Sequence, residues 1–199
     1  MTALADMTSS GEVVLVAPDV LRDMAAALGG LWSPDAEDDA ARRDLLLAAA
    51  RIRLYADRDR CGWYLVAGAE ARDAVLRRED ADWNVGFVAP IEEFDDAPAE
   101  ADVAALVQLL RHGEEGEHLD AEAATTLALA ILSDPVTVVV TRDPRAYRHQ
   151  RVDDLPRRLR LLSPAEVVEL LEIGVGEQPP DPVPSWNLLA QGPAWWVPA

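Results

Sequence analysis

The sequence predicts an α/β fold, a three-layer α/β/α sandwich with a mostly parallel sheet. Residues 13–16 and 136–140 are short runs rich in valine, which is typical of strands buried on both faces, as in parallel sheets. Helix-forming segments alternate with strand-like segments along the chain, and this alternation favours a parallel sheet covered by helices. A chain of 199 residues, half of them hydrophobic, fits one such domain.

Each expected element has a local signal. Pro18 breaks the first apolar run, and Gly29-Gly30 stop the helix that follows it. A period-two alternation of apolar and polar residues at 52–55 predicts a strand. In chain order we expect a strand at 13–16, helices at 20–28 and 38–50, strands at 52–55 and 63–66, a helix at 69–78, a long surface loop at 79–100, a helix at 101–111, a helix opened by Asp120 and Glu122, strands at 136–140 and 159–162, and a final helix from Pro164.

The final helix has the strongest start signal in the chain. Ser163 can cap it, Pro164 suits the first helical position, and Glu166 completes a capping box. The sequence therefore predicts a strand-to-helix step at this point.

The domain is expected to span residues 12–175, between a flexible start at residues 1–11 and a tail at residues 176–199 that is rich in Pro and Trp. Near its end the tail carries Trp195-Trp196. Two interpretations of this pair stay open. The tail anchors a protein partner, since tryptophan is favoured at interface hot spots, or it folds back over its own domain.

Composition excludes several kinds of chemistry. The chain has 36 acidic and 18 basic residues and no lysine, so it has neither a P-loop lysine nor a Schiff-base lysine. A net charge of −18 repels polyanions at long range. Cys61 is alone, the first ten residues lack the positive charge of a secretory signal, and no apolar run is long enough to cross a membrane. We therefore expect a cytoplasmic protein without membrane contact, and make no prediction of its oligomeric state.

Acidic residues occur where a parallel sheet would gather them. Asp120 and Glu122 open a helix, and Asp143 follows the valine-rich strand at 136–140. In a parallel α/β sheet, strand C-termini and helix N-termini lie at the same edge, where ligands normally bind. These carboxylates could therefore converge on one metal ion.

Four blocks of the chain, in order, are similar to a known family. They are 13–21 (Val-Val-Leu-Val-Ala-Pro-Asp-Val-Leu), 119–124 (Leu-Asp-Ala-Glu-Ala-Ala), 140–143 (Val-Thr-Arg-Asp) and 162–167 (Leu-Ser-Pro-Ala-Glu-Val). With these blocks, residues 12–173 resemble the PIN-domain family, metal-dependent ribonucleases that include many toxins of bacterial toxin–antitoxin pairs. The resemblance implies a parallel sheet flanked by helices, hydrolysis of RNA phosphodiesters, and a carboxylate cluster around Mg²⁺ or Mn²⁺.

The resemblance also assigns roles by position. Asp143 takes the place of the family's last acid, and Glu122, or Asp120, that of the preceding one. A further helical acid between the first and third blocks would be Glu70 or Asp73.

The first block departs from the family's pattern. Ala17 stands where the family usually has its leading Asp, and Asp19 follows two residues later. Asp19 would replace the missing acid only if its side chain turns inward. An inward Asp19 supports an enzyme, and an outward Asp19 supports a protein that only binds.

In the enzyme hypothesis, Asp19, Glu122 and Asp143 are the catalytic metal ligands, with Asp120 as outer support. Carboxylate oxygens suit Mg²⁺ or Mn²⁺, and such a metal activates water and neutralises the phosphate. The other interpretation is that Asp19 and Asp120 cap helices and offset helix dipoles.

A basic stretch follows the third block. Arg142, Arg145 and Arg148 are its first members, and they could bind RNA phosphates. They could equally pair with neighbouring aspartates on a solvated surface, or dock an acidic protein partner.

Two functions remain open. The first is a Mg²⁺- or Mn²⁺-dependent ribonuclease. The second is a catalytically inactive PIN-fold module that binds or regulates through protein partners, which Ala17, the negative charge and the aromatic tail favour.

Overall fold

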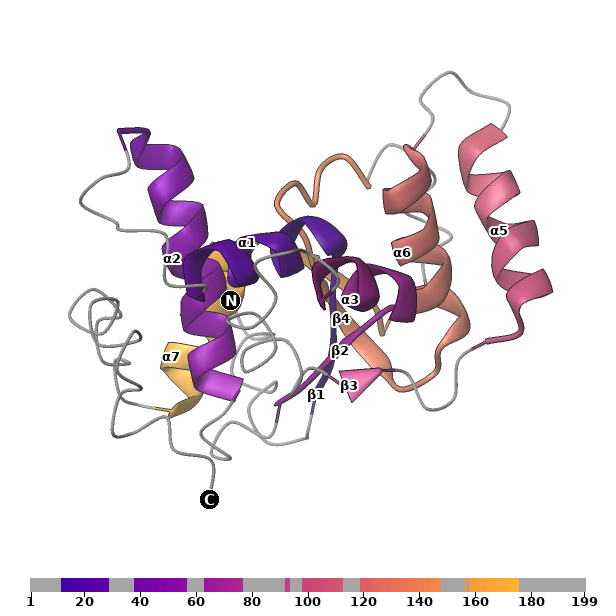
Figure 1. Cartoon of the computed structure of the whole chain (residues 1–199). Helices are drawn as coiled ribbons and strands as arrows, with labels where there is room; N and C mark the ends of the chain where they lie inside the picture. Colours follow the sequence, from indigo (N-terminus) through magenta and orange to yellow (C-terminus); the bar gives the residue numbers. More distant parts are fainter. Residues whose placement is uncertain are drawn as a thin grey trace.

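The computed structural model of the chain describes residues 12–28, 38–56, 63–76, 92–93, 98–112, 119–147, 156 and 158–175. Within these residues, a single sheet has the strand order β3-β2-β1-β4-β5, and every neighbouring pair is parallel (Figure 1). The strands are β1 Glu12–Val16, β2 Trp63–Ala67, β3 Glu92–Glu93, β4 Val136–Val140 and β5 Arg160–Leu162.

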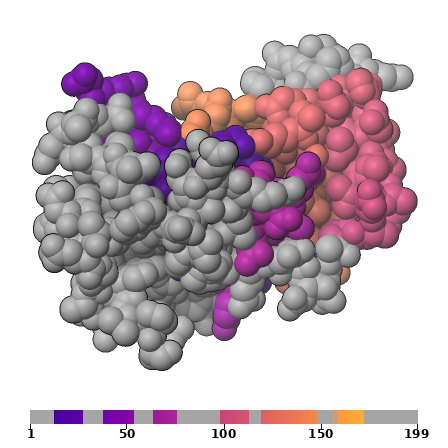
Figure 2. Space-filling view, viewed as in Figure 1, coloured from indigo at the N-terminus to yellow at the C-terminus, as the bar shows by residue number. Residues whose placement is uncertain are grey.

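Helices cover both faces of the sheet. On one face lie α1 Pro18–Leu28, α2 Ala40–Ala56, α3 Ala69–Leu76 and α7 Pro164–Val175, and on the other lie α5 Glu100–His112 and α6 Ala121–Leu132. Figure 1 shows the sheet between these two groups, and in Figure 2 α5 and α6 form one flank while the start of α2 lies at the opposite flank. The predicted three-layer α/β/α sandwich is confirmed.

The central strand explains the two cores. Val14 and Val16 of β1 pack in the cluster with α1, α2 and α7, whereas Leu15 packs in the cluster with α6. Successive side chains of a strand point to opposite faces, and all three residues are buried. Both faces of β1 are therefore apolar, as the valine-rich run predicts.

The strand predicted at 52–55 is wrong, because α2 continues through Ala56. The buried residues Leu46, Ala49, Ala50 and Arg53 recur with helical spacing, which places them on one face of the helix. The short apolar–polar alternation is compatible with that face. The longer helical period therefore decides the structure.

Helix starts follow the predicted caps. Asp120 accepts a hydrogen bond from the Ala123 amide (2.7 Å) at the start of α6. Ser163 and Glu166 form the capping box of α7: the Ser163 amide and hydroxyl donate to Glu166 (2.7 and 2.8 Å), and the Glu166 amide donates to the Ser163 hydroxyl oxygen (3.3 Å).

The predicted start and tail, residues 1–11 and 176–199, lie outside the described residues, as does most of the predicted loop at 79–100. Among the described residues, no helix combines the length and the apolar character that a membrane span requires.

Candidate functional site

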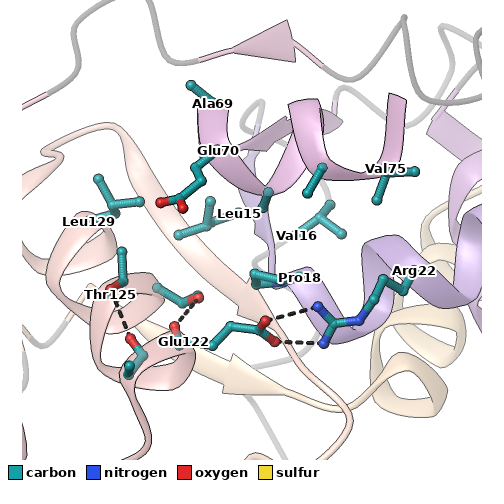
Figure 3. A pocket seen from close by; sticks show the side chains of 15 residues that line it. Leu15, Val16, Pro18, Arg22, Ala69, Glu70, Val75, Glu122, Thr125 and Leu129 are labelled. Atoms are coloured by element: carbon teal, nitrogen blue, oxygen red, sulfur yellow. Dashed lines mark hydrogen bonds and ion pairs between the residues drawn. The ribbon is translucent and has the colours of Figure 1, made fainter. Parts of the chain in front are cut away.

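Three helices begin at the carboxyl edge of the sheet around one cavity. The cavity has a volume of about 440 Å³ and is lined by the end of β1 and by residues of α1, α3 and α6 (Figure 3). Most of the lining is apolar, and its charged members are Arg22, Glu70 and Glu122. Ligands of parallel α/β sheets normally bind at this edge, so the cavity is the candidate site.

Arg22 and Glu122 close one side of the cavity as an ion pair. The two terminal nitrogens of Arg22 each donate to one carboxylate oxygen of Glu122, at 2.8 and 2.6 Å (Figure 3). These hydrogen bonds raise the pKa of the Arg22 guanidinium, and the nearby charges of Asp19 and Asp23 act in the same direction while partial burial opposes it. Both oxygens of Glu122 are thus already held by a cation.

Asp19 turns inward toward the end of β4, as the enzyme hypothesis requires. One carboxylate oxygen accepts from the Val20 amide at 2.8 Å. The other accepts from the Thr141 hydroxyl at 3.0 Å and from the Arg142 amide at 2.9 Å. Asp19 therefore joins the start of α1 to the segment after β4, and both of its carboxylate oxygens accept hydrogen bonds from other groups of the protein.

Asp23 is the buried acid of this region, and no sequence motif pointed to it. Its side chain is 0 % exposed and contacts Arg42 of α2 and Arg142 after β4. Arg142 Nε donates to Asp23 Oδ2 at 2.6 Å, and further guanidinium N–H groups of both arginines reach Oδ1. These bonds raise the pKa of Arg142. The only sequence signal was the spacing of four residues from Asp19, which puts both acids on one side of α1.

The other two predicted metal ligands stabilise local backbone. Asp120 caps α6, as the alternative interpretation predicts. Asp143 accepts hydrogen bonds from the amides of Arg145 (2.9 Å) and Ala146 (3.3 Å) in the turn that follows β4. Of the four predicted ligands, Glu122 is the one that lines the cavity.

This donor set does not fit a divalent cation. Mg²⁺ and Mn²⁺ need carboxylate oxygens free to coordinate, whereas Arg22 holds both oxygens of Glu122 and amide or hydroxyl groups hold those of Asp19. Among the described residues, no three His, Cys, Asp or Glu side chains are grouped so as to hold a metal.

The basic stretch divides into separate roles. Arg142 donates to Asp23, while Arg145 is exposed at the surface. Arg158 donates to the carbonyl oxygens of Ile131 (3.2 Å), Ser133 (3.1 Å) and Val136 (3.4 Å), and so satisfies acceptors at the end of α6. Arg148 lies outside the described residues.

Glu70 is the remaining charge of the cavity. It stands in the first turn of α3, is exposed, and has no hydrogen bond or ion pair with another described residue. Figure 3 shows its carboxylate extending from α3 on the side of the cavity nearest Leu129. Asp73, the other candidate for the helical acid, is not among the residues that line the cavity.

Tyr147, which follows β4, is buried among the apolar residues of the α6 face. Burial raises its pKa to about 12, a hydrogen bond with Thr141 opposes that change, and the charges of Asp19, Asp120 and Glu122 add to it. The phenol is therefore neutral at physiological pH and belongs to the core of the α6 face.

Comparison of the chain with protein-family models, with curated proteins and with solved structures found no match. The resemblance to PIN domains therefore stays a prediction from the four sequence blocks.

Proposed function

We propose that the chain is a catalytically inactive PIN-like module that binds a ligand at the carboxyl edge of its sheet and regulates through protein partners. In this proposal arginine side chains take the place of the divalent cation that the resemblance implies. The observation that carries it is the two-point contact between Arg22 and Glu122, at 2.8 and 2.6 Å.

The pairing of the acidic side chains with arginines supports the proposal. A metal-dependent nuclease needs a surplus of negative charge, which the cation then balances. Here the guanidinium of Arg22 balances Glu122, and those of Arg42 and Arg142 contact Asp23. Asp19 is stabilised by three hydrogen bonds. Ala17, at the position of the family's leading acid, is buried and supplies no oxygen from its side chain.

The proposal also includes a protein partner for the tail and a cytoplasmic location. The tail at 176–199 would reach a protein partner through Trp195-Trp196, and the single Cys61, which leaves no intramolecular disulfide, favours the cytoplasm.

The metal-dependent ribonuclease remains the second candidate, favoured by one observation. Asp19 faces inward and lies at the same edge as Glu122, so two of the three predicted catalytic acids are near each other; their common influence on Arg22 reflects this. Mg²⁺ or Mn²⁺ and RNA would then be the cofactor and the substrate.

A metal and RNA assay separates the two candidates. The purified chain is titrated with Mn²⁺ by calorimetry and incubated with a single-stranded RNA of mixed sequence and Mn²⁺. Glu122→Gln tests the predicted ligand, and Glu169→Gln, an exposed acid of α7, is the matched control. We expect no saturable Mn²⁺ binding and the same background cleavage in all three proteins. Cleavage that Glu122→Gln abolishes and Glu169→Gln retains would overturn the proposal.

A further inference from the structure

We infer that the cavity between α1, α3 and α6 binds a small organic cation, an amine or guanidine on an apolar body. The inference rests on the proposed binding role and names the class of ligand for that site. Size, wall chemistry and charge each point to this class.

The volume suits a small molecule. At about 440 Å³, the cavity falls within the range of roughly 300–1,000 Å³ that is typical of ligand pockets. It lies at the ligand-binding edge of the sheet and opens between three separate elements. A metal ion or a single water would leave most of this space unfilled.

The walls select an apolar body. Leu15 and Val16 at the end of β1, Pro18 of α1, Val75 of α3 and Leu129 of α6 all contribute to the lining. The hydroxyls of Thr125 and Thr126 donate to carbonyl oxygens of their own helix, at 2.8 and 2.9 Å. Apolar surface of a ligand would therefore meet apolar side chains, and its removal from water favours binding.

The charges select a cation. Arg22 and Glu122 neutralise each other, so Glu70 leaves the lining with one net negative charge. Helix N-termini favour anions, but each of the three helices carries an acid in its first turn, Asp19, Glu70 or Glu122. Two of these acids, Glu70 and Glu122, line the cavity, so an anionic ligand would face them. The whole chain, with a net charge of −18, also attracts cations at long range.

A set of three six-carbon ligands tests this inference. Hexylammonium, hexanol and hexanoate share one apolar stem and differ in charge, and their binding to the full chain is followed by calorimetry and by NMR shifts. We expect hexylammonium to bind about two- to fivefold more tightly than hexanol, the ratio that one exposed ion pair supplies, and hexanoate to bind more weakly than hexanol.

Three variants locate the site. Glu70→Gln is expected to reduce hexylammonium binding to the level of hexanol, whereas the control Glu169→Gln leaves it unchanged. Ala74 is exposed and lines the cavity, so Ala74→Trp is expected to abolish binding of all three ligands by filling the space. Circular dichroism checks that each variant is folded.

Equal binding of hexanol and hexylammonium, stronger binding of hexanoate, or no effect of Glu70→Gln would overturn the inference. The inference would also be overturned if a short lysine peptide binds the chain and hexylammonium does not, because the ligand would then be a protein side chain. Failure here leaves the metal and RNA assay unaffected, since that assay depends on Glu122 and this one on Glu70.

Discussion

Two groups of arginine–carboxylate contacts lie at the same end of the sheet and begin from Arg22 and Asp23, adjacent residues of α1. Asp23 is 0 % exposed and contacts two guanidiniums, from α2 and from the segment after β4. Arg22 contacts Glu122 of α6 with side chains that are 44 % and 45 % exposed. Adjacent residues of a helix point about 100° apart, so one turns into the protein and the other toward the cavity.

The difference shows that exposure, more than bonding geometry, decides what such a contact does. A charge removed from water depends on its partners, because an unpaired buried charge is very unfavourable. An exposed pair is screened by water and contributes little to stability. The contacts of Asp23 therefore hold α1, α2 and the segment after β4 together, while the exposed Arg22–Glu122 pair contributes little to stability.

The largest expected effect comes from removing the buried acid. Asp23→Ala leaves Arg42 and Arg142 close together without their shared carboxylate. We expect the free energy of unfolding to fall by about 3 kcal/mol, the lower end of the range for a broken buried pair, because the two guanidiniums are 33 % and 37 % exposed. Urea denaturation measures this change. Asp44→Ala, which removes an exposed acid of α2, is the control and should change stability by less than about 0.5 kcal/mol.

A triple variant sharpens this result. Replacing Asp23 with Leu and both arginines with Met removes all three charges together, and we expect it to lose less stability than Asp23→Ala alone. If the single variant is as stable as the native chain, the buried cluster does not have the structural role that its burial indicates.

The second effect depends on pH. Burial raises the pKa of Tyr147 to about 12, so the folded state keeps this proton at pH values where the unfolded chain, with a pKa of about 10, releases it. Stability is then fully present below about pH 10 and falls as the pH rises to 12, by on the order of 2–3 kcal/mol. Urea denaturation across this range measures the loss.

Tyr147→Phe should remove this component of the pH dependence, because the phenyl ring has no proton to lose. Tyr64→Phe is the control, since Tyr64 is 61 % exposed. Identical pH profiles for the native chain and Tyr147→Phe would contradict the prediction.

The smallest effect is expected from the exposed pair. In a double-mutant cycle of Arg22→Ala and Glu122→Ala, we expect a coupling energy of roughly 0.2–1 kcal/mol, decreasing as salt is added. Thermal or urea unfolding at low and high salt measures it. A coupling energy above about 2 kcal/mol would contradict the prediction, because the exposed pair would then stabilise the fold nearly as much as the buried contacts of Asp23.

The sequence predicted the elements that depend on local signals. The valine-rich runs became β1 and β4, and Ser163, Pro164 and Glu166 formed the predicted start of α7. Asp120 caps α6, which is the alternative interpretation that its position before an alanine-rich run offered beside the metal-ligand prediction. In each case the signal lies in neighbouring residues, and for β1 and β4 the pairing of the two strands completes the structure.

What the sequence could not predict depends on contacts between distant segments. The partners Asp23 and Arg142 are 119 residues apart, and Arg22 and Glu122 are 100 apart, so no spacing rule connects them. The same applies to residues 52–55, where burial of Arg53 and Ile52 within α2 outweighed a four-residue alternation.

Asp19 has a consequence for where a ligand can approach. In a doubly wound sheet the connections diverge where the strand order reverses, here between β1 and β4. The carboxylate of Asp19, at the start of α1, links the segment after β1 to the segment after β4, because it accepts hydrogen bonds from Thr141 and Arg142. These hydrogen bonds occupy the switch point itself, and the cavity lies beside it, lined by the end of β1 and by residues of α1, α3 and α6.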